Sequence, residues 1–167
     1  MRYTIAMPVL VLALADPAAT HAVGRALGAA LRGGDVVALV GDLGAGKTTL
    51  VAGVVAGAGG DAGAVASPTF ALVHDYRGPL AIGHVDLYRL ERDRDVDELG
   101  LDELWARPDG ATLVEWADKF WSRLPADRLE VELTYDGDAR RLTATARGPA
   151  AVRLLDGWRA ALAPRLG

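Results

Sequence analysis

The sequence of 167 residues contains no cysteine. This absence excludes disulfide bonds, thiolate nucleophiles and zinc sites built on thiolates, and it suits a reducing cytoplasm. An excess of basic residues is missing too, since the net charge is −4. A free-standing nucleic-acid-binding protein usually carries a basic face, so we expect any contact with RNA to be local or supplied by a partner.

Long hydrophobic runs are also missing, because none approaches the roughly 18 to 20 residues of a membrane-spanning helix. One shorter run, residues 9–15, ends in Ala-Leu-Ala and could be taken for the core and cleavage site of a signal peptide. We favour a strand followed by a helix, since Asp16 is a good N-cap and Pro17 suits the first helical position. We therefore expect no membrane association and a cytoplasmic location.

Hydrophobic residues make up 51% of the chain, enough for a sizeable core in one domain spanning residues 1–167. Their spacing predicts an α/β protein. Helices are expected from Pro17 to the Gly33-Gly34 pair, from Thr49 to about Ala58, in one or two short pieces over 91–105, and after Pro149. Strands are expected at 9–15, 35–40, 71–76, 80–85, 111–114, 129–135 and 142–146.

Residues 41–48 read GDLGAGKT and fit the pattern G-x-x-x-x-G-K-[ST]. A buried strand is expected before them and a helix after them, which is the context of a phosphate-binding P-loop. The glycines allow the backbone N–H groups to turn inward around a polyphosphate. Lys47 is expected to reach the β- and γ-phosphates, and Thr48 to bind the Mg²⁺ that bridges them. The strand, the spacing and the Lys-Thr pair together argue against a plain glycine-rich turn.

Two acidic residues follow buried strands, at the edge where a parallel sheet places its ligand crevice. Asp86 has the position of a Walker B acid, which holds the Mg²⁺ shell or orients an attacking water, and Glu115 follows another strand. We prefer these roles to a helix cap or a surface acid. His74 and His84 are expected to face the sheet or solvent, since no second histidine lies at ligand spacing.

The segment Ser67-Pro68-Thr69-Phe70 has two interpretations. Ser67 and Thr69 could sense the γ-phosphate or Mg²⁺ and order their segment as a switch. A plain proline-containing turn explains the same residues equally well. Trp116, beside Glu115, is the tryptophan expected near the nucleotide. The other tryptophans are expected in or at the edge of the core: Trp105, Trp121 and Trp158.

Four segments together resemble the TsaE (formerly YjeE) family, small bacterial ATPases of tRNA threonylcarbamoyladenosine synthesis. They are residues 41–50, SPTF at 67–70, HVDLYRL at 84–90 and VEW at 114–116, within a resemblance covering roughly residues 16–147. It implies a P-loop NTPase-like three-layer α/β fold with a mixed sheet, bound ATP and Mg²⁺, and an ATPase that is feeble alone. In that family the protein joins TsaD and TsaB. Its ATP cycle is thought to reset their complex between rounds of modifying adenosine 37 of tRNAs that read codons starting with A, and tRNA is met only within the assembly.

The resemblance also implies residue roles by matching motif positions. The catalytic residues are Lys47, Asp86 and Thr69, and the Mg²⁺ ligands are Thr48, Glu115 and Asp86. The nucleotide contacts are Thr20, near the adenine, with Leu43, Gly44, Ala45, Gly46, Lys47, Thr48, Thr49, Trp116, Asp118 and Arg141. Family members often have proline after the Glu-Trp pair where this chain has Ala117, which leaves the role of Asp118 open. The C-terminal helix lies outside the shared pattern.

Two other functions stay open from the sequence. A small-molecule or nucleoside kinase would use the same loop, with Asp86 as the base toward a substrate hydroxyl. The scarcity of lid insertions and arginine clamps argues against a kinase. A nucleotide-gated binding module without meaningful hydrolysis is the other possibility. A GTPase is not expected, because the Asn-Lys-x-Asp guanine-reading motif is missing.

Overall fold

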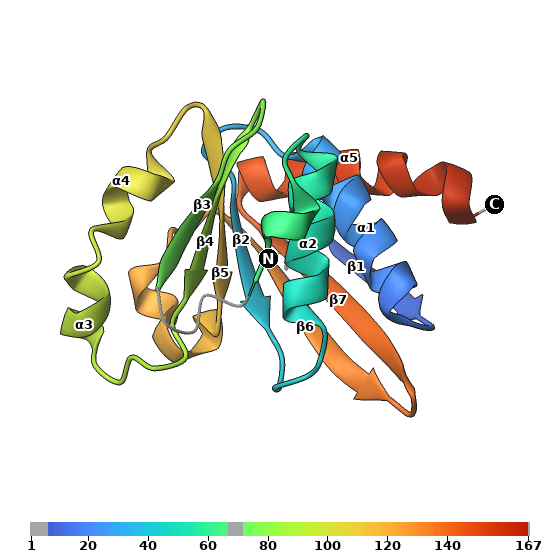
Figure 1. The fold of residues 1–167 in the computed structure, drawn as a ribbon, viewed down its shortest axis with the longest axis horizontal. Coiled ribbons are helices and arrows are strands. Elements are labelled where there is room, and N and C mark those ends of the chain that lie inside the picture. Colours follow the sequence, from blue (N-terminus) through green and yellow to red (C-terminus); the bar gives the residue numbers. More distant parts are fainter. Residues whose placement is uncertain (1–6, 67–71, 167) are drawn as a thin grey trace, which may run out of the picture.

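The computed structural model describes residues 7–66 and 72–166. Its strands are β1 (Val9–Leu14), β2 (Val36–Val40), β3 (Val73–Tyr76), β4 (Ala81–Asp86), β5 (Gly110–Glu115), β6 (Arg128–Asp136) and β7 (Ala139–Arg147). Its helices are α1 (Pro17–Ala30), α2 (Lys47–Gly57), α3 (Asp93–Asp97), α4 (Leu101–Trp105) and α5 (Pro149–Leu166), with 3₁₀ segments η1 (Ala62–Ala64) and η2 (Ala117–Arg123). The expected α/β fold is confirmed (Figure 1).

The strands form one mixed sheet in the order β1-β7-β6-β2-β5-β4-β3. The four central strands β6, β2, β5 and β4 are parallel to one another, because β2 pairs in parallel with both β5 and β6, and β4 pairs in parallel with β5. The outer pairings, β1 with β7, β6 with β7 and β3 with β4, are antiparallel. The carboxyl ends of β2, β4 and β5 therefore meet at one edge of the sheet.

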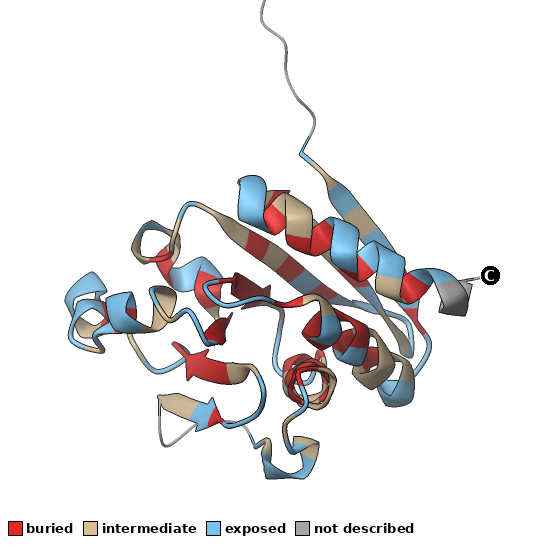
Figure 2. Ribbon diagram, turned by 90° about the horizontal axis from the view of Figure 1, so that it is seen from above, coloured by how far each residue is buried: buried red, intermediate tan, exposed pale blue. Residues whose placement is uncertain are grey.

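Helices cover both faces of the sheet and give it three layers (Figure 1). The larger core lies between the sheet and α1, α2 and α5, and the smaller core lies under α3, α4 and η2. Figure 2 shows buried and exposed residues alternating along α5, as expected for a helix that covers a sheet with one side. Trp158 of α5 is fully buried and donates its indole N–H to the Val23 carbonyl at 3.1 Å, so its predicted core position is confirmed.

The start of the described chain folds as the preferred interpretation predicts. β1 pairs with β7, and Asp16 caps α1 by accepting a hydrogen bond from the Ala19 N–H at 2.8 Å. Pro17 occupies the first helical position. Among the helices of residues 7–66 and 72–166, none is long and apolar enough to span a membrane.

Several boundaries differ from the sequence prediction. The segments η1 and η2 were not predicted, and β3 begins at Val73 rather than at residue 71, which lies outside the described residues. The late hairpin is longer than expected, since pairing continues to Asp136 opposite Ala139. Alternation of apolar residues stops at the polar tip of this hairpin, although backbone pairing does not, so hydrophobic pattern alone understates its length.

Glycines bring α1 and α2 into backbone contact. A Cβ on Gly24 or Gly28 of α1 would overlap the carbonyl oxygens of Leu50 and Val54 in α2, and Gly53 and Gly57 face α1 in the same way. This contact matters for the site because Lys47 begins α2. Close packing against α1 therefore helps to fix the helix that starts at the glycine-rich loop.

We predict that Gly28→Ala lowers the free energy of unfolding by about 1–3 kcal/mol, because overpacking outweighs the better helix propensity of alanine. Gly157→Ala in α5 is the matched control, since its Cβ would lie 3.4 Å from the Ala30 Cβ, an ordinary contact. The control should be neutral or slightly stabilising. Urea unfolding of both variants measures the difference, and equal stabilities would contradict the close packing of α1 on α2.

Candidate functional site

The glycine-rich loop connects the buried strand β2 to α2, as predicted. Gly44 and Gly46 have φ angles of 79° and 107°, in the left-handed region that favours glycine. A Cβ on Gly41 would lie 2.7 Å from the Leu133 carbonyl oxygen, so the path of the loop also requires close backbone approach. Gly46 is the N-cap of α2 and provides no side-chain hydrogen bond to its first turn. The helix N-terminus thus keeps donors for an anion.

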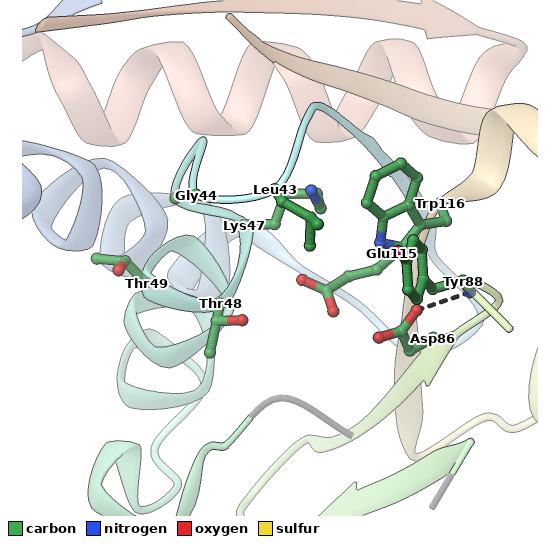
Figure 3. Close-up of a pocket in the computed structure, with 10 residues that line it drawn as sticks. Leu43, Gly44, Lys47, Thr48, Thr49, Asp86, Tyr88, Glu115 and Trp116 are labelled. Carbon is green, nitrogen blue, oxygen red and sulfur yellow. Dashed lines mark hydrogen bonds between the residues drawn. The ribbon is translucent and has the colours of Figure 1, made fainter. Parts of the chain in front are cut away.

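A pocket of about 310 Å³ lies in front of this loop. Its lining comes from the loop, the start of α2 and the ends of β4 and β5: Leu43, Gly44, Gly46, Lys47, Thr48, Thr49, Asp86, Tyr88, Glu115 and Trp116 (Figure 3). Asp86 and Glu115 are register partners in the parallel pair β4 and β5, which brings their side chains to the same edge. The structure therefore unites most of the predicted site residues in one pocket.

Lys47 is buried although it carries the expected positive charge of the site. Its ammonium donates hydrogen bonds to the carbonyl oxygens of Gly41 and, at 3.0 Å, Asp42. It also lies 4.4 Å from the centroid of the Trp116 ring. Burial lowers the pKa of Lys47, whereas the negative charges of Glu115 and Asp86 oppose this shift. The loop thus holds the ammonium beside the pocket, where a phosphate oxygen could replace these carbonyl partners.

Asp86 and Glu115 form a buried acidic pair, with exposed fractions of 5% and 2%. Burial raises the pKa of Asp86, the N–H of Tyr88 at 2.9 Å opposes the shift, and the charge of Glu115 adds to it. Two neighbouring buried carboxylates are costly unless a cation accompanies them. The site is therefore chemically suited to a cation between these acids and a polyphosphate.

The raised pKa of Asp86 has a consequence for stability. A carboxyl that binds its proton more tightly in the folded chain stabilises the fold when protonated, and this contribution is lost as pH rises from about 3.9 through the higher folded-state pKa. Without nucleotide, Asp86→Asn should therefore melt at a higher temperature than the wild type at pH 7, by about 2–4 °C per kcal/mol gained. The difference should shrink as pH falls through that window.

Thermal melts from pH 3.5 to 8 measure this effect. Asp102→Asn is the matched control, because Asp102 is an exposed aspartate on α4 that does not line the pocket. The control should melt in parallel with the wild type over the whole range. Parallel curves for Asp86→Asn as well would contradict a destabilising buried charge at this position.

The predicted Mg²⁺ ligands suit a metal ion that is bound partly by protein side chains and partly by the phosphates of a nucleotide. In Figure 3 the Thr48 hydroxyl and the carboxylates of Glu115 and Asp86 face the space in front of the loop. Among the residues that the structure describes, no cluster of three or more His, Cys, Asp and Glu side chains could hold a metal ion. Mg²⁺ usually binds through one or two carboxylates and the phosphates of a substrate, so this donor set suits it.

A second pocket of about 130 Å³ lies on the other side of the loop. Thr20 lines it together with Asp16, Gly44, Thr49 and Arg140, and the Thr20 side chain is nearly fully buried. Thr20 therefore lies beside the loop, on a different side from the acidic pair. Ala45, also predicted to line the phosphates, is fully buried and lines only this second pocket of the two.

Arg141 is not placed at the loop. Its guanidinium is exposed and lies 3.5 Å from the Asp136 carboxylate, whereas the preceding Arg140 reaches the Gly44 carbonyl at 3.4 Å. Neighbouring strand residues point to opposite faces, and Arg140 shares its face with the buried Leu142. This alternation could have been used to choose Arg140, rather than Arg141, as the arginine that reaches the loop. Tyr135 was missed too, and its hydroxyl donates to the Leu43 carbonyl at 2.8 Å.

The remaining predicted residues are Asp118, Ser67 and Thr69. Asp118 does not line the pocket in front of the loop, although its charge acts on the pKa of Lys47. Thr69 and Ser67 lie outside the described residues.

His84 is fully buried, and its Nε2 lies 3.3 Å from the Glu115 Oε2. The sequence interpretation had not connected His84 with the site, although its spacing of two from Asp86 on a strand predicts a shared face.

The mixed sheet, the glycine-rich loop between β2 and α2, and the acids at the ends of β4 and β5 define an α/β protein of the P-loop NTPase-like class. The family model described as "Threonylcarbamoyl adenosine biosynthesis protein TsaE" matches residues 14–143. The chain therefore belongs to the TsaE family.

Individual relatives agree with this assignment. The tRNA threonylcarbamoyladenosine biosynthesis protein TsaE of Bacillus subtilis is 41% identical over 135 residues, covering 80% of this chain and 83% of the relative. The protein of the same name from Mycobacterium leprae is 45% identical over 122 residues, covering 68% and 75%. The crystal structure of Bacillus subtilis YdiB matches with a TM-score of 0.78 and 31% identity, covering 94% of this chain and 98% of that one.

Proposed function

We propose that the chain binds ATP with Mg²⁺ and hydrolyses it as a subunit required for threonylcarbamoyladenosine modification of tRNA. The observation that carries this proposal is the single pocket in which the glycine-rich loop, Lys47 and the acids Asp86 and Glu115 meet. The relatives' names supply the pathway, since they are tRNA threonylcarbamoyladenosine biosynthesis proteins. Together they favour a nucleotide-driven role in tRNA modification over an unrelated use of the loop.

The loop would bind the triphosphate. Its N–H groups and the N-terminus of α2 donate to phosphate oxygens, and Lys47 exchanges the carbonyls of Gly41 and Asp42 for the β- and γ-phosphates. Trp116 lies beside Lys47 and forms one wall of the pocket. The adenine would lie toward Thr20, on the side of the loop where the second pocket opens.

Thr48, Asp86 and Glu115 would hold the Mg²⁺, which neutralises charge on the phosphates when bound. Asp86 would also orient the attacking water by accepting its hydrogen bond. The Tyr88 N–H donates to one oxygen of this carboxylate and leaves the other to face the Mg²⁺ and its waters.

The proposed activity is weak in isolation and is stimulated in an assembly with TsaD and TsaB, in the cytoplasm. The net charge of −4 suits a subunit that contacts proteins and meets tRNA only within the assembly. The threonylcarbamoyl group itself would be transferred elsewhere in that assembly.

Complementation tests the proposal in cells. In a strain depleted of the endogenous protein, the wild-type chain should restore threonylcarbamoyladenosine in bulk tRNA, measured by mass spectrometry of nucleosides, and Lys47→Ala should not. Arg94→Ala, an exposed arginine in α3, is the control for loss of one positive charge. Normal tRNA modification in the Lys47→Ala strain would contradict the proposed role.

A further inference from the structure

We propose that His84 is a positioning residue that orients the Glu115 carboxylate toward a metal ion bound with the nucleotide. This inference rests on the proposed function, because it assumes that Glu115 binds Mg²⁺. The sequence and the comparisons assign no role to His84. Its position in the structure gives it one.

His84 and Glu115 are buried together. The imidazole is fully buried, Glu115 is 2% exposed, and the distance between Nε2 and Oε2 is 3.3 Å. The two atoms are close but not aligned as a hydrogen bond, and among the residues that the structure describes neither ring nitrogen has another hydrogen-bond partner. Hydrogen bonds at such sites are often loose without ligand and tighten when it binds.

The sheet register places His84 behind Glu115. In the parallel pair of β4 and β5, Asp86 lies opposite Glu115, and His84 lies opposite Leu113, two pairs further from the carboxyl ends. His84, Asp86 and Glu115 therefore share one face of the sheet. Because His84 does not line the pocket, it contacts Glu115 from inside the core and leaves the pocket side of the carboxylate open.

Tyr76 packs against His84 without competing for its nitrogens. The two ring centroids are 6.0 Å apart, and Tyr76 is nearly fully buried on the adjacent strand β3. The Tyr76 hydroxyl is engaged elsewhere, by the Ala66 carbonyl at 3.4 Å and by the His74 Nδ1 at 3.3 Å. Glu115 is thus the polar partner to which the imidazole can donate a hydrogen bond.

The geometry favours the imidazole tautomer that carries its proton on Nε2, the nitrogen that faces Glu115. That tautomer donates to Glu115 and leaves only an acceptor, Nδ1, unpaired, which costs less than an unpaired buried donor. A hydrogen bond from behind limits the rotation of the carboxylate. Groups that orient a metal-binding carboxylate in this way typically change metal affinity by about 10- to 100-fold.

Two variants of similar polarity separate positioning from simple packing. In His84→Gln the amide nitrogen can reach the place of Nε2, whereas in His84→Asn it lies near the place of Nδ1. Calorimetric titration with a non-hydrolysable ATP analogue, over a series of Mg²⁺ concentrations, measures apparent Mg²⁺ affinity. We expect His84→Gln to stay near the wild type, and His84→Asn to need about 10- to 100-fold more Mg²⁺. Nucleotide affinity without Mg²⁺ should stay unchanged in both.

The Glu115→Gln background provides the second test. There His84→Asn should cause no further change in Mg²⁺ dependence, because the carboxylate through which His84 acts is gone. The inference is overturned if His84→Asn binds Mg²⁺ like the wild type, or if both variants weaken nucleotide binding equally with and without Mg²⁺. A wild-type chain whose nucleotide binding ignores Mg²⁺ would overturn the proposed function as well, so the two failures are distinguishable.

Discussion

Replacing Lys47 with alanine should lower the rate of ATP hydrolysis by about 100- to 1,000-fold, the usual cost of removing one preorganised group that stabilises transition-state charge. Lys47 is buried at the start of α2, and its ammonium is held beside the pocket by the carbonyls of Gly41 and Asp42. A cation from solvent would have to lose its water and be positioned before it could stabilise the transition state, whereas the lysine is already desolvated and in place. Nucleotide affinity should fall as well.

The purified variants can be compared by phosphate release under saturating ATP and Mg²⁺. Arg94→Ala removes a positive charge from an exposed position on α3 and should retain the wild-type rate. Circular dichroism and thermal melts establish that Lys47→Ala is folded. A folded Lys47→Ala that hydrolyses ATP at the wild-type rate would rule out the loop as the phosphate site.

The second large effect is expected for Asp86→Asn, which should reduce hydrolysis by about 100- to 10,000-fold while ATP still binds. The amide retains an oxygen that can accept the Tyr88 N–H at 2.9 Å, so the local backbone should survive. What is lost is the negative charge that orients water and helps to hold Mg²⁺. The same substitution should stabilise the empty protein at pH 7, as argued above, which separates lost catalysis from lost folding.

Asp102→Asn on α4 is the control for this experiment too, and it should leave both the rate and ATP binding unchanged. Single-turnover hydrolysis and equilibrium binding are measured on the same samples. If Asp86→Asn lost hydrolysis yet supported normal partner binding and tRNA modification, the chain would act as a nucleotide-gated binding module. Hydrolysis, in that case, would not be its function.

The glycine-rich loop could be predicted from sequence because its parts are adjacent in the chain. Three glycines, a lysine and a threonine within residues 41–48 specify a local backbone shape, and the flanking apolar run and helix specify its setting. Asp86 and Glu115 could be predicted for a related reason. The end of a buried strand in a parallel sheet is a position that periodicity alone can locate.

Other parts of the site depend on how distant segments pair. The contact of His84 with Glu115 follows from the register of β4 and β5, which the sequence does not state. The choice between Arg140 and Arg141 depends on which face of β7 turns toward the loop. Trp116 adopts a left-handed φ of 59° immediately before η2, a conformation that its residue type disfavours and that tertiary packing must impose.

The most direct test of the proposed function is ATP hydrolysis by the purified chain, alone and with TsaD and TsaB, with Lys47→Ala as the blank. We predict a low rate for the chain alone, a marked rise when both partners are added, and no rise for Lys47→Ala. Partners that change nothing would contradict the proposal. Transfer of labelled γ-phosphate to a hydroxyl-bearing metabolite would instead identify the chain as a kinase.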